Sequence, residues 1–355
     1  MKRIGKSTLE FTNAPVILSR AAIGGKKEAE GPLGADFDQT FYDTSLAQDS
    51  WEKAEAQLQK EAVSLALKKG NLTPEQMDFI FAGDLLNQCI SSTFGLLNFQ
   101  IPFLGQYGAC STMAQTLLMA AMSVESGAAE HAVAVTSSHF ASAERQFRTP
   151  LEYGAQRTPT AQWTATAAGC LVLGKDDGQK RVKIKRGLVG KIVDLGVKDP
   201  ANMGAAMAPA AADSILQFLQ DTGESDTAYD GIFTGDLGFV GTRLLHQSLQ
   251  DNGLDLTDVH DDCGLLLFDR EGQDVHAGGS GCGCSASVLC GHLLNRMEAV
   301  LNDPNAPTTV ERPALRRILF CATGALMSPT SSQQGESIPG VCHVVELEAS
   351  RLGHS

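Results

Sequence analysis

Two stretches of this 355-residue chain repeat each other, and the repeat limits the folds that are open to it. Residues 78–85 read DFIFAGDL, and residues 230–237 read DGIFTGDL. Two shorter echoes follow in the same order, CS at 110–111 and 284–285, and AVTS at 134–137 against CATG at 321–324. Ordered matches of this kind predict two duplicated halves that differ by insertions.

Helix-like and strand-like segments alternate along both halves. One helix is expected between a capping Ser50 and a terminating Gly70. Apolar runs typical of buried strands lie at residues 79–82, 132–136, 170–173, 232–233, 265–268, 318–321 and 341–347. This alternation predicts an α/β protein with mostly parallel sheets, built from two βαβαβ-type halves. The halves are predicted to span residues 1–176 and 177–355, because 174–178 (GKDDG) forms a polar turn between them.

The composition excludes several classes of function. Acidic residues outnumber basic ones by 41 to 28, and a net charge of −13 argues against nucleic-acid binding. Nine cysteines without the spacing of a disulfide scaffold suggest reduced thiols in a cytoplasm-like compartment. The sequence offers neither a signal peptide nor an apolar run long enough to span a membrane, so we expect a chain without its own anchor.

A basic segment follows the predicted junction between the halves. Seven lysines and arginines lie within residues 175–191. They predict a solvated edge strand that lysines protect against pairing with another sheet. The alternative is a contact for an anionic membrane surface or an acidic partner.

Cys110 is the leading candidate for a reactive residue. It lies directly before a helix, at about 113–122, that is apolar nearly all round. The positive end of a helix dipole favours thiolate and lowers the pKa of a thiol, so Cys110 is expected to alkylate faster than the other eight cysteines. The alternative is a buried and inert thiol, which is common for free cysteine.

Cysteine-based acyl chemistry also needs a base and an oxyanion donor. His139 follows a predicted strand end and is the best placed of the eight histidines, although a hydrogen-bonded structural histidine is the alternative. Arg145 lies in a polar cluster, residues 144–148, that would suit a carboxylate ligand. The glycine-rich segment 278–285 predicts a sharp turn with close backbone approach, and its cysteines lack the spacing of a zinc site.

The duplicated halves, the cysteine turn and the apolar helix resemble the thiolase fold, specifically its ketoacyl-synthase III branch. Over longer runs the chain resembles the family of stage V sporulation proteins AD from endospore-forming bacteria. The resemblance covers essentially the whole chain and implies α-β-α-β-α layers. The segments that carry it are 30–34, 82–88, 108–112, 136–139, 143–148, 203–213, 277–282 and 322–330.

The chain departs from the enzymes of that branch at two places. The segment that aligns with the catalytic histidine, 232–237, contains no histidine, and the segment that aligns with the catalytic asparagine, 281–285, contains no asparagine. Claisen condensation without both groups would lose most of its transition-state stabilisation. The resemblance therefore implies a pocket that lacks the catalytic machinery.

The sporulation family implies a protein that binds dipicolinic acid (pyridine-2,6-dicarboxylate) and assists its uptake into the developing spore. It also implies a location in the spore cytoplasm at the inner membrane, membrane-embedded partners of the same transport machinery, and a homodimer. No resident cofactor is expected, with calcium as a companion of the ligand. The expected site residues are Cys110 (the vestigial nucleophile position), Ser111, Thr136, Ser137, His139, Arg145, Asp84, Asp236 and Cys282.

Two other functions remain open at this point. One is an active acyltransferase of the ketoacyl-synthase type that uses Cys110 with an unrecognised base such as His139. The other is a scaffold that docks a membrane channel and whose pocket is a relic.

Overall fold

The computed structural model describes residues 1–147, 157–303 and 314–349, and it contains one long mixed sheet with a repeated strand order. The first five main strands are β3 (Val16–Gly25), β5 (Phe79–Gly83), β6 (Phe103–Gly105), β7 (His131–Ser138) and β9 (Ala167–Gly174). The second five are β10 (Val182–Leu188), β11 (Gly231–Thr234), β12 (His260–Asp262), β14 (Arg317–Ala325) and β15 (Gly340–Ala349). In space they run β6-β5-β7-β9-β3 and β12-β11-β14-β15-β10, and the last strand of each set, β9 or β15, is antiparallel to its neighbours. The α/β class and the duplication are thereby confirmed, but the expectation of mostly parallel sheets is wrong, because β9 and β15 pair antiparallel on both sides.

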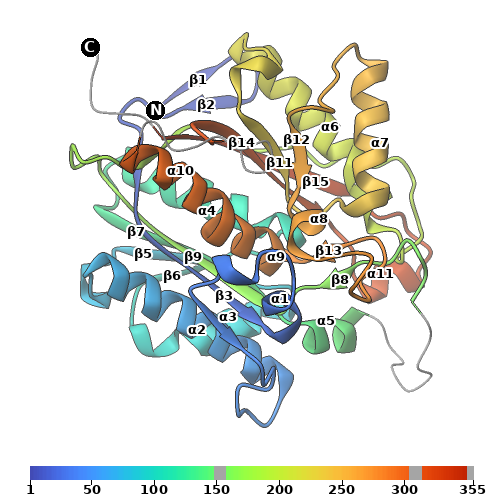
Figure 1. Ribbon diagram of the computed structural model, residues 1–355, viewed down its shortest axis with the longest axis horizontal. Coiled ribbons are helices and arrows are strands. Elements are labelled where there is room, and N and C mark those ends of the chain that lie inside the picture. Colours follow the sequence, from blue (N-terminus) through green and yellow to red (C-terminus); the bar gives the residue numbers. More distant parts are fainter. Residues whose placement is uncertain (148–156, 304–313, 350–355) are drawn as a thin grey trace.

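Helices separate and cover the two halves of the sheet, which gives five layers (Figure 1). The outer helices are α2 (Trp51–Gly70) and α3 (Ile90–Leu96) on the first half, and α6 (Met203–Thr222) and α7 (Gly238–Asp251) on the second. The middle layer holds α4 (Thr112–Glu125) and α9 (Cys282–Ser287), which continues through a π-helical turn at 288–293 into α10 (Leu294–Asn302). This is the expected α-β-α-β-α arrangement.

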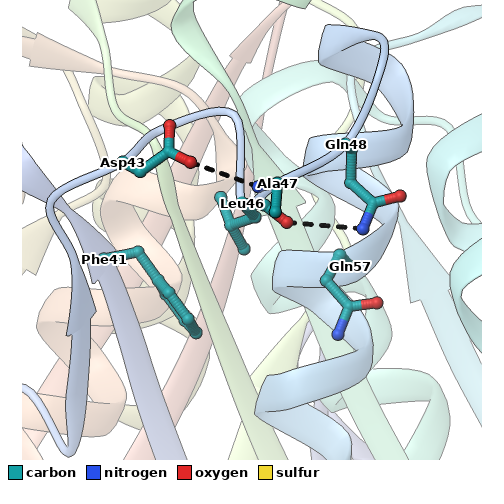
Figure 2. A pocket seen from close by; sticks show the side chains of 6 residues that line it. All are labelled: Phe41, Asp43, Leu46, Ala47, Gln48 and Gln57. Carbon is teal, nitrogen blue, oxygen red and sulfur yellow. Dashed lines mark hydrogen bonds between the residues drawn. The ribbon is translucent and has the colours of Figure 1, made fainter.

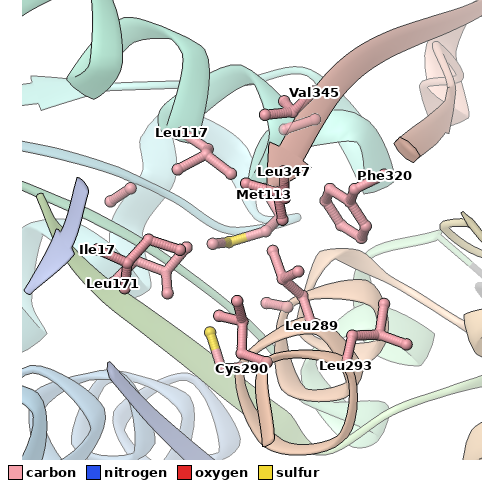
Figure 3. Packing of buried hydrophobic residues seen from close by; sticks show 14 of the residues in the cluster. Ile17, Met113, Leu117, Leu171, Leu289, Cys290, Leu293, Phe320, Val345 and Leu347 are labelled. Carbon is pink, nitrogen blue, oxygen red and sulfur yellow. The ribbon is translucent and has the colours of Figure 1, made fainter. Parts of the chain in front are cut away.

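The central helix α4 is apolar nearly all round because it packs between both halves of the sheet. It contacts β5 and β7 on one side and β14 and β15 on the other. Figure 3 shows Met113 and Leu117 of α4 pointing at Leu289 of the middle layer and at Phe320 and Val345 of the second half. The start of such a helix is held rigidly at the centre of the molecule, and Cys110 lies in the turn directly before it.

Shorter elements complete the fold. The hairpin β1 (Lys2–Ile4) and β2 (Thr8–Glu10) pairs with β10, and β4 (Gln39–Phe41) pairs with β3. A separate two-stranded sheet joins β8 (Trp163–Thr164) to β13 (Gly279–Ser280). The remaining α-helices of the described ranges are α1 (Lys26–Ala29), α5 (Phe140–Phe147), α8 (Cys263–Leu267) and α11 (Pro329–Gln333). No helix in these ranges has the length and apolar content needed to cross a bilayer.

Two predictions about local structure are wrong. The apolar run 265–268 lies mostly in the short helix α8, since Asp262 caps it by accepting the N–H of Gly264 at 3.1 Å. The basic segment is not at a sheet edge, because β10 pairs with β15 and with β2. Five of its seven charges are paired within the chain: Lys175 with Glu130, Arg181 with Asp177, Lys183 with Asp176, Arg186 with Glu10 and Glu224, and Lys191 with Asp213.

Candidate functional site

Cys110 lies in a tight turn directly before α4, and only 5% of its surface is exposed. The preceding residue, Ala109, has a φ of 51°, a left-handed backbone conformation that costs energy for a residue with a Cβ. The thiol Sγ lies 3.8 Å from the hydroxyl Oγ of Ser280 in β13. The turn therefore holds the cysteine in a fixed, strained position against the second half of the fold.

Asp236 is the carboxylate of this site. It follows β11, is fully buried, and accepts hydrogen bonds from Ser280 Oγ at 3.1 Å, from Gly281 N at 2.9 Å and from Thr323 Oγ1 at 3.0 Å. The donors come from three parts of the second half: β13, the turn before α9, and β14. Asp236 thus ties together the loops that face Cys110.

The Cys110 thiol is a poor nucleophile in this environment. Burial raises its pKa well above the ordinary value, and the neighbouring Asp236 carboxylate raises it further. The prediction that the helix N-terminus lowers this pKa is therefore wrong in direction. The helix dipole acts on Cys110, but burial and a negative neighbour outweigh it.

We expect Cys110 to react slowly with iodoacetamide at neutral pH. Its labelling rate in the folded protein should be at least about tenfold below its rate in the urea-unfolded chain, because the thiol is buried and protonated. Mass spectrometry of tryptic peptides at several times measures both rates. Labelling of Cys110 ahead of the other eight cysteines would contradict the pKa direction given above.

Cys282 lies beside Cys110, as expected from the sequence, and Thr136 contacts Cys282. Cys282 packs in one small apolar cluster with Cys110 and Leu85, and its thiol donates to the carbonyl of Ser137 at 3.0 Å. Thr136 Oγ1 donates to the carbonyl of Cys282 at 3.0 Å. These contacts join the end of β7, in the first half, to the start of α9, in the second half, beside Cys110.

Two further buried acids lie in the first half, Asp84 directly after β5 and Glu55 in α2. Asp84 accepts from the N–H of Leu86 and from both the N–H and the hydroxyl of Ser92, at 2.8, 2.8 and 2.6 Å. Glu55 of α2 accepts from Ser137 Oγ at 3.2 Å and from Ser142 Oγ at 2.7 Å. Burial raises the pKa of both carboxyl groups, and Asp84 raises that of Glu55 further. Sequence reasoning missed Glu55, although an acid on the apolar stripe of helix 51–70 was a usable signal.

The chain matches the family model described as Stage V sporulation protein AD (SpoVAD) over residues 5–348. It is also 43% identical over 348 residues to Stage V sporulation protein AD of Bacillus subtilis (strain 168), which covers 98% of each chain. The chain belongs to the stage V sporulation protein AD family.

Solved structures of other proteins share the fold of this SpoVAD-family chain. One is a 3-oxoacyl-[acyl-carrier-protein] synthase III from Aquifex aeolicus VF5, with a TM-score of 0.53 at 11% identity, covering 94% of this chain and 99% of the other. Another is OleA from Xanthomonas campestris, with a TM-score of 0.60 at 13% identity, covering 96% and 98%. At these identities the likeness concerns the fold alone, and it confirms the thiolase-like architecture.

The two segments that lack the catalytic residues of the synthases do lie against Cys110 in this SpoVAD-family member. The first contributes Asp236, and the second contributes Gly281 and Cys282. A carboxylate and a thiol therefore lie beside the cysteine at these two positions. Ser111, also expected in the site, donates to the carbonyl of Gly108 at 2.7 Å and stabilises the turn.

Two predicted site residues are engaged elsewhere. Both ring nitrogens of His139 are used, since Nδ1 accepts the N–H of Ala141 at 3.1 Å and Nε2 lies 2.8 Å from the carbonyl of Thr44. Burial lowers the pKa of His139, so it is a neutral structural histidine and not a base for Cys110. Arg145 is 55% exposed and pairs with Glu52 at the surface, so the expectation that it lines a buried ligand pocket is wrong.

A cavity of about 390 Å³ opens at the connection between β4 and α2 (Figure 2). Its lining includes Phe41, Leu46 and Gln57, and it is framed by a turn in which Asp43 accepts the N–H of Ala47 at 3.2 Å. None of the lining residues was predicted as a site residue, and none belongs to the cluster around Cys110.

Proposed function

We propose that this protein binds dipicolinic acid and assists its uptake into the developing spore, and that its thiolase-type site is catalytically silent. Membership of the stage V sporulation protein AD family supports the role in sporulation. The contacts of Asp236 beside Cys110 are the observation that carries the catalytic part of the proposal.

Condensation chemistry conflicts with these contacts. An oxyanion needs free donors, but the N–H of Gly281 is already donated to the Asp236 carboxylate. A negative group near Cys110 also opposes both thiolate formation and a developing oxyanion. His139, the histidine predicted as a base, is held by backbone groups.

The lining of this site also argues against a dianion next to Cys110. Asp236, Asp84 and Glu55 are all buried around this part of the fold, and a buried dianion needs cations instead. Arg145 does not supply that charge, because Glu52 already pairs with it. We therefore place the ligand outside the buried acidic cluster.

Calorimetry with dipicolinate and with a short acyl-CoA, side by side, tests the proposal. Dipicolinate is expected to bind the wild-type protein and the Cys110→Ala variant with affinities that agree within about threefold, because the ligand lies outside the cluster that contains Cys110. Repeating the titration with calcium shows whether the metal accompanies the ligand. Absence of dipicolinate binding would refute the proposal.

Acyl-CoA and malonyl thioesters are expected to give no condensation above the Cys110→Ala control, which a coupled assay for released CoA measures. The reason is the protonated thiol beside Asp236 and the occupied Gly281 N–H. Turnover clearly above that control would favour the acyltransferase alternative.

We further propose that the protein acts as a homodimer in the spore cytoplasm, at the inner membrane beside membrane-embedded proteins of the same transport machinery. The edge strand β6 supports the dimer, since all three of its residues are exposed and it has a free side. Large apolar side chains gather around it: Phe94 (64% exposed), Leu97 (58%), Phe103 (41%), Leu104 (46%) and Tyr107 (53%). An apolar face of this kind is typical of a protein–protein interface.

Replacing Leu104 by aspartate should weaken the dimer at least about tenfold, because it places a charge in the apolar face between two copies. Sedimentation equilibrium measures the dissociation constant. Leu195→Asp, at a residue that is 74% exposed and belongs to the second half of the chain, is the matched control. Equal dissociation constants for the two variants would exclude β6 as the interface.

A further inference from the structure

The cavity between β4 and α2 lies apart from the thiolase-type site, and its lining has a distinct chemical character. Its volume of about 390 Å³ is in the usual range for a small-molecule site. The residues that line it are Phe41, Asp43, Leu46, Ala47, Gln48 and Gln57. Neither a lysine nor an arginine is among these described residues. The lining therefore combines apolar surface with one carboxylate and two amides, and it supplies no positive charge.

The two amides that line the cavity have engaged their nitrogens within the chain. Gln57 Nε2 donates to Glu61 Oε1 at 2.6 Å, one turn further along α2, and Gln48 Nε2 donates to the carbonyl of Leu46 at 3.3 Å. The carbonyl oxygens of both amides accept from none of the residues that the structure describes. The polar atoms that the amides leave for a ligand are therefore mainly acceptors.

Asp43 supplies a negative charge at the same cavity. Its carboxylate accepts from Ser45 Oγ at 2.7 Å, from Ser45 N at 3.0 Å and from Ala47 N at 3.2 Å. The Ser45 hydroxyl above all, and then the two N–H groups, lower the pKa of Asp43, so it is ionised at neutral pH. A carboxylate has about four lone-pair sites, so acceptor capacity remains for a ligand.

An aromatic ring completes the cavity. Phe41 ends β4 and packs against the core cluster of the first half, to which the buried Leu46 belongs. In Figure 2, Phe41 lies on one side of the cavity, and Gln48 and Gln57 lie on the other. The face of an aromatic ring attracts a cation, and a planar cation stacks on it. A ring, a carboxylate and two carbonyl oxygens thus surround one space, and all of them favour a cation that donates hydrogen bonds.

We propose that this cavity binds an alkylguanidinium group, which is the group that an arginine side chain carries. The positive charge pairs with Asp43, the other N–H donors meet the carbonyl oxygens of Gln48 and Gln57, and the alkyl chain packs on Phe41 and Leu46. Guanidinium fits this lining better than ammonium, because it is planar, presents several donors in one plane and is less strongly hydrated. The net charge of −13 also attracts cations to the protein. This site is independent of the dipicolinate binding proposed above.

Three ligands with the same alkyl chain test the charge and the shape of the group. n-Butylguanidinium should bind the full chain at least about tenfold more tightly than n-butylurea, its neutral analogue, because the urea cannot form the charge-assisted contact. n-Butylammonium has the charge without the planar donors and should bind about threefold more weakly than n-butylguanidinium. Saturation-transfer NMR titrations at low salt measure the three dissociation constants. Equal affinity for guanidinium and urea would overturn the proposal, and equal affinity for ammonium would overturn the assignment to guanidinium.

Variants of the cavity locate the site. Asp43→Asn should weaken n-butylguanidinium binding about tenfold or more, and asparagine can still accept from the N–H groups of the turn. Asp49→Asn is the matched control, because it removes the same charge from the same connection at a side chain that is 77% exposed, pairs with Lys53 and does not line the cavity. It should bind like the wild type. Gln57→Leu leaves the turn untouched and should weaken binding about threefold. Equal binding by Asp43→Asn and Asp49→Asn would exclude this cavity as the site.

Two further probes separate a free metabolite from a protein segment as the source of the guanidinium. They are free L-arginine and the tripeptide Gly-Arg-Gly with both ends blocked. Tighter binding of the free amino acid supports a metabolite, and tighter binding of the tripeptide supports an arginine from a partner protein. Binding of neither probe, nor of n-butylguanidinium, would overturn the proposal. Dipicolinate titrations are a separate measurement, so the failure of one proposal leaves the other standing.

Discussion

Replacing Asp236 by alanine should lower the free energy of unfolding by about 3–5 kcal/mol. The substitution leaves three buried donors without their acceptor, from Ser280, Gly281 and Thr323. Each buried donor left unpaired costs roughly 1–3 kcal/mol, and the small cavity adds to the loss. Urea unfolding followed by circular dichroism measures the change.

Two variants show whether the loss comes from these hydrogen bonds. Asp236→Asn keeps an acceptor oxygen and should lose less than the alanine variant, while the loss of the negative charge should lower the pKa of Cys110. Asp258→Ala, at an exposed aspartate, should change stability by about 0.5 kcal/mol or less. If Asp236→Ala and Asp258→Ala unfold at the same urea concentration, Asp236 does not hold the loops together.

The repeat and the polarity pattern were sufficient to predict the layers. Residues 78–85 and 230–237 form the same strand and turn in each half, β5 and β11, and the apolar helix before which Cys110 lies is the central helix α4. The segments with Asp236 and Cys282 also lie beside Cys110, as the resemblance implied. The hydrophobic pattern was informative here because it shows which segments form strands and which helix is buried on all sides.

The electrostatics of the site could not be predicted in the same way. A helix N-terminus is visible in the sequence, but the burial of Cys110 and its distance from Asp236 depend on how the two halves pack. Arg145 was misjudged because its partner, Glu52, lies on another helix.

The buried acids should make the protein less stable as the pH rises above neutral. Burial raises the pKa of Glu28 and of Asp262 to about 7, and burial together with Asp84 raises that of Glu55. Asp262 accepts from Thr234 Oγ1 at 2.7 Å and from the Leu237 N–H at 2.8 Å, which limits the shift but does not cancel it. These folded-state pKa values exceed those of the unfolded chain, so the folded protein binds more protons near neutrality.

The stability that these acids contribute is fully present below pH 4 and is lost as the pH rises through 7 and above. Two histidines oppose this trend, but only at lower pH. Burial lowers the pKa of His260 to about 3 and that of His343 to about 4. The folded protein therefore loses stability on their account only as the pH falls below the unfolded value of about 6.5. Between pH 6.5 and 8.5 the carboxyl groups therefore dominate, and the free energy of unfolding should fall by on the order of 3 kcal/mol. Urea unfolding at both pH values measures this change.

Glu55→Gln, which can still accept from Ser137 or Ser142, should make the dependence of stability on pH shallower. A stability that rises from pH 6.5 to 8.5 would show that these acids are ionised in the folded protein.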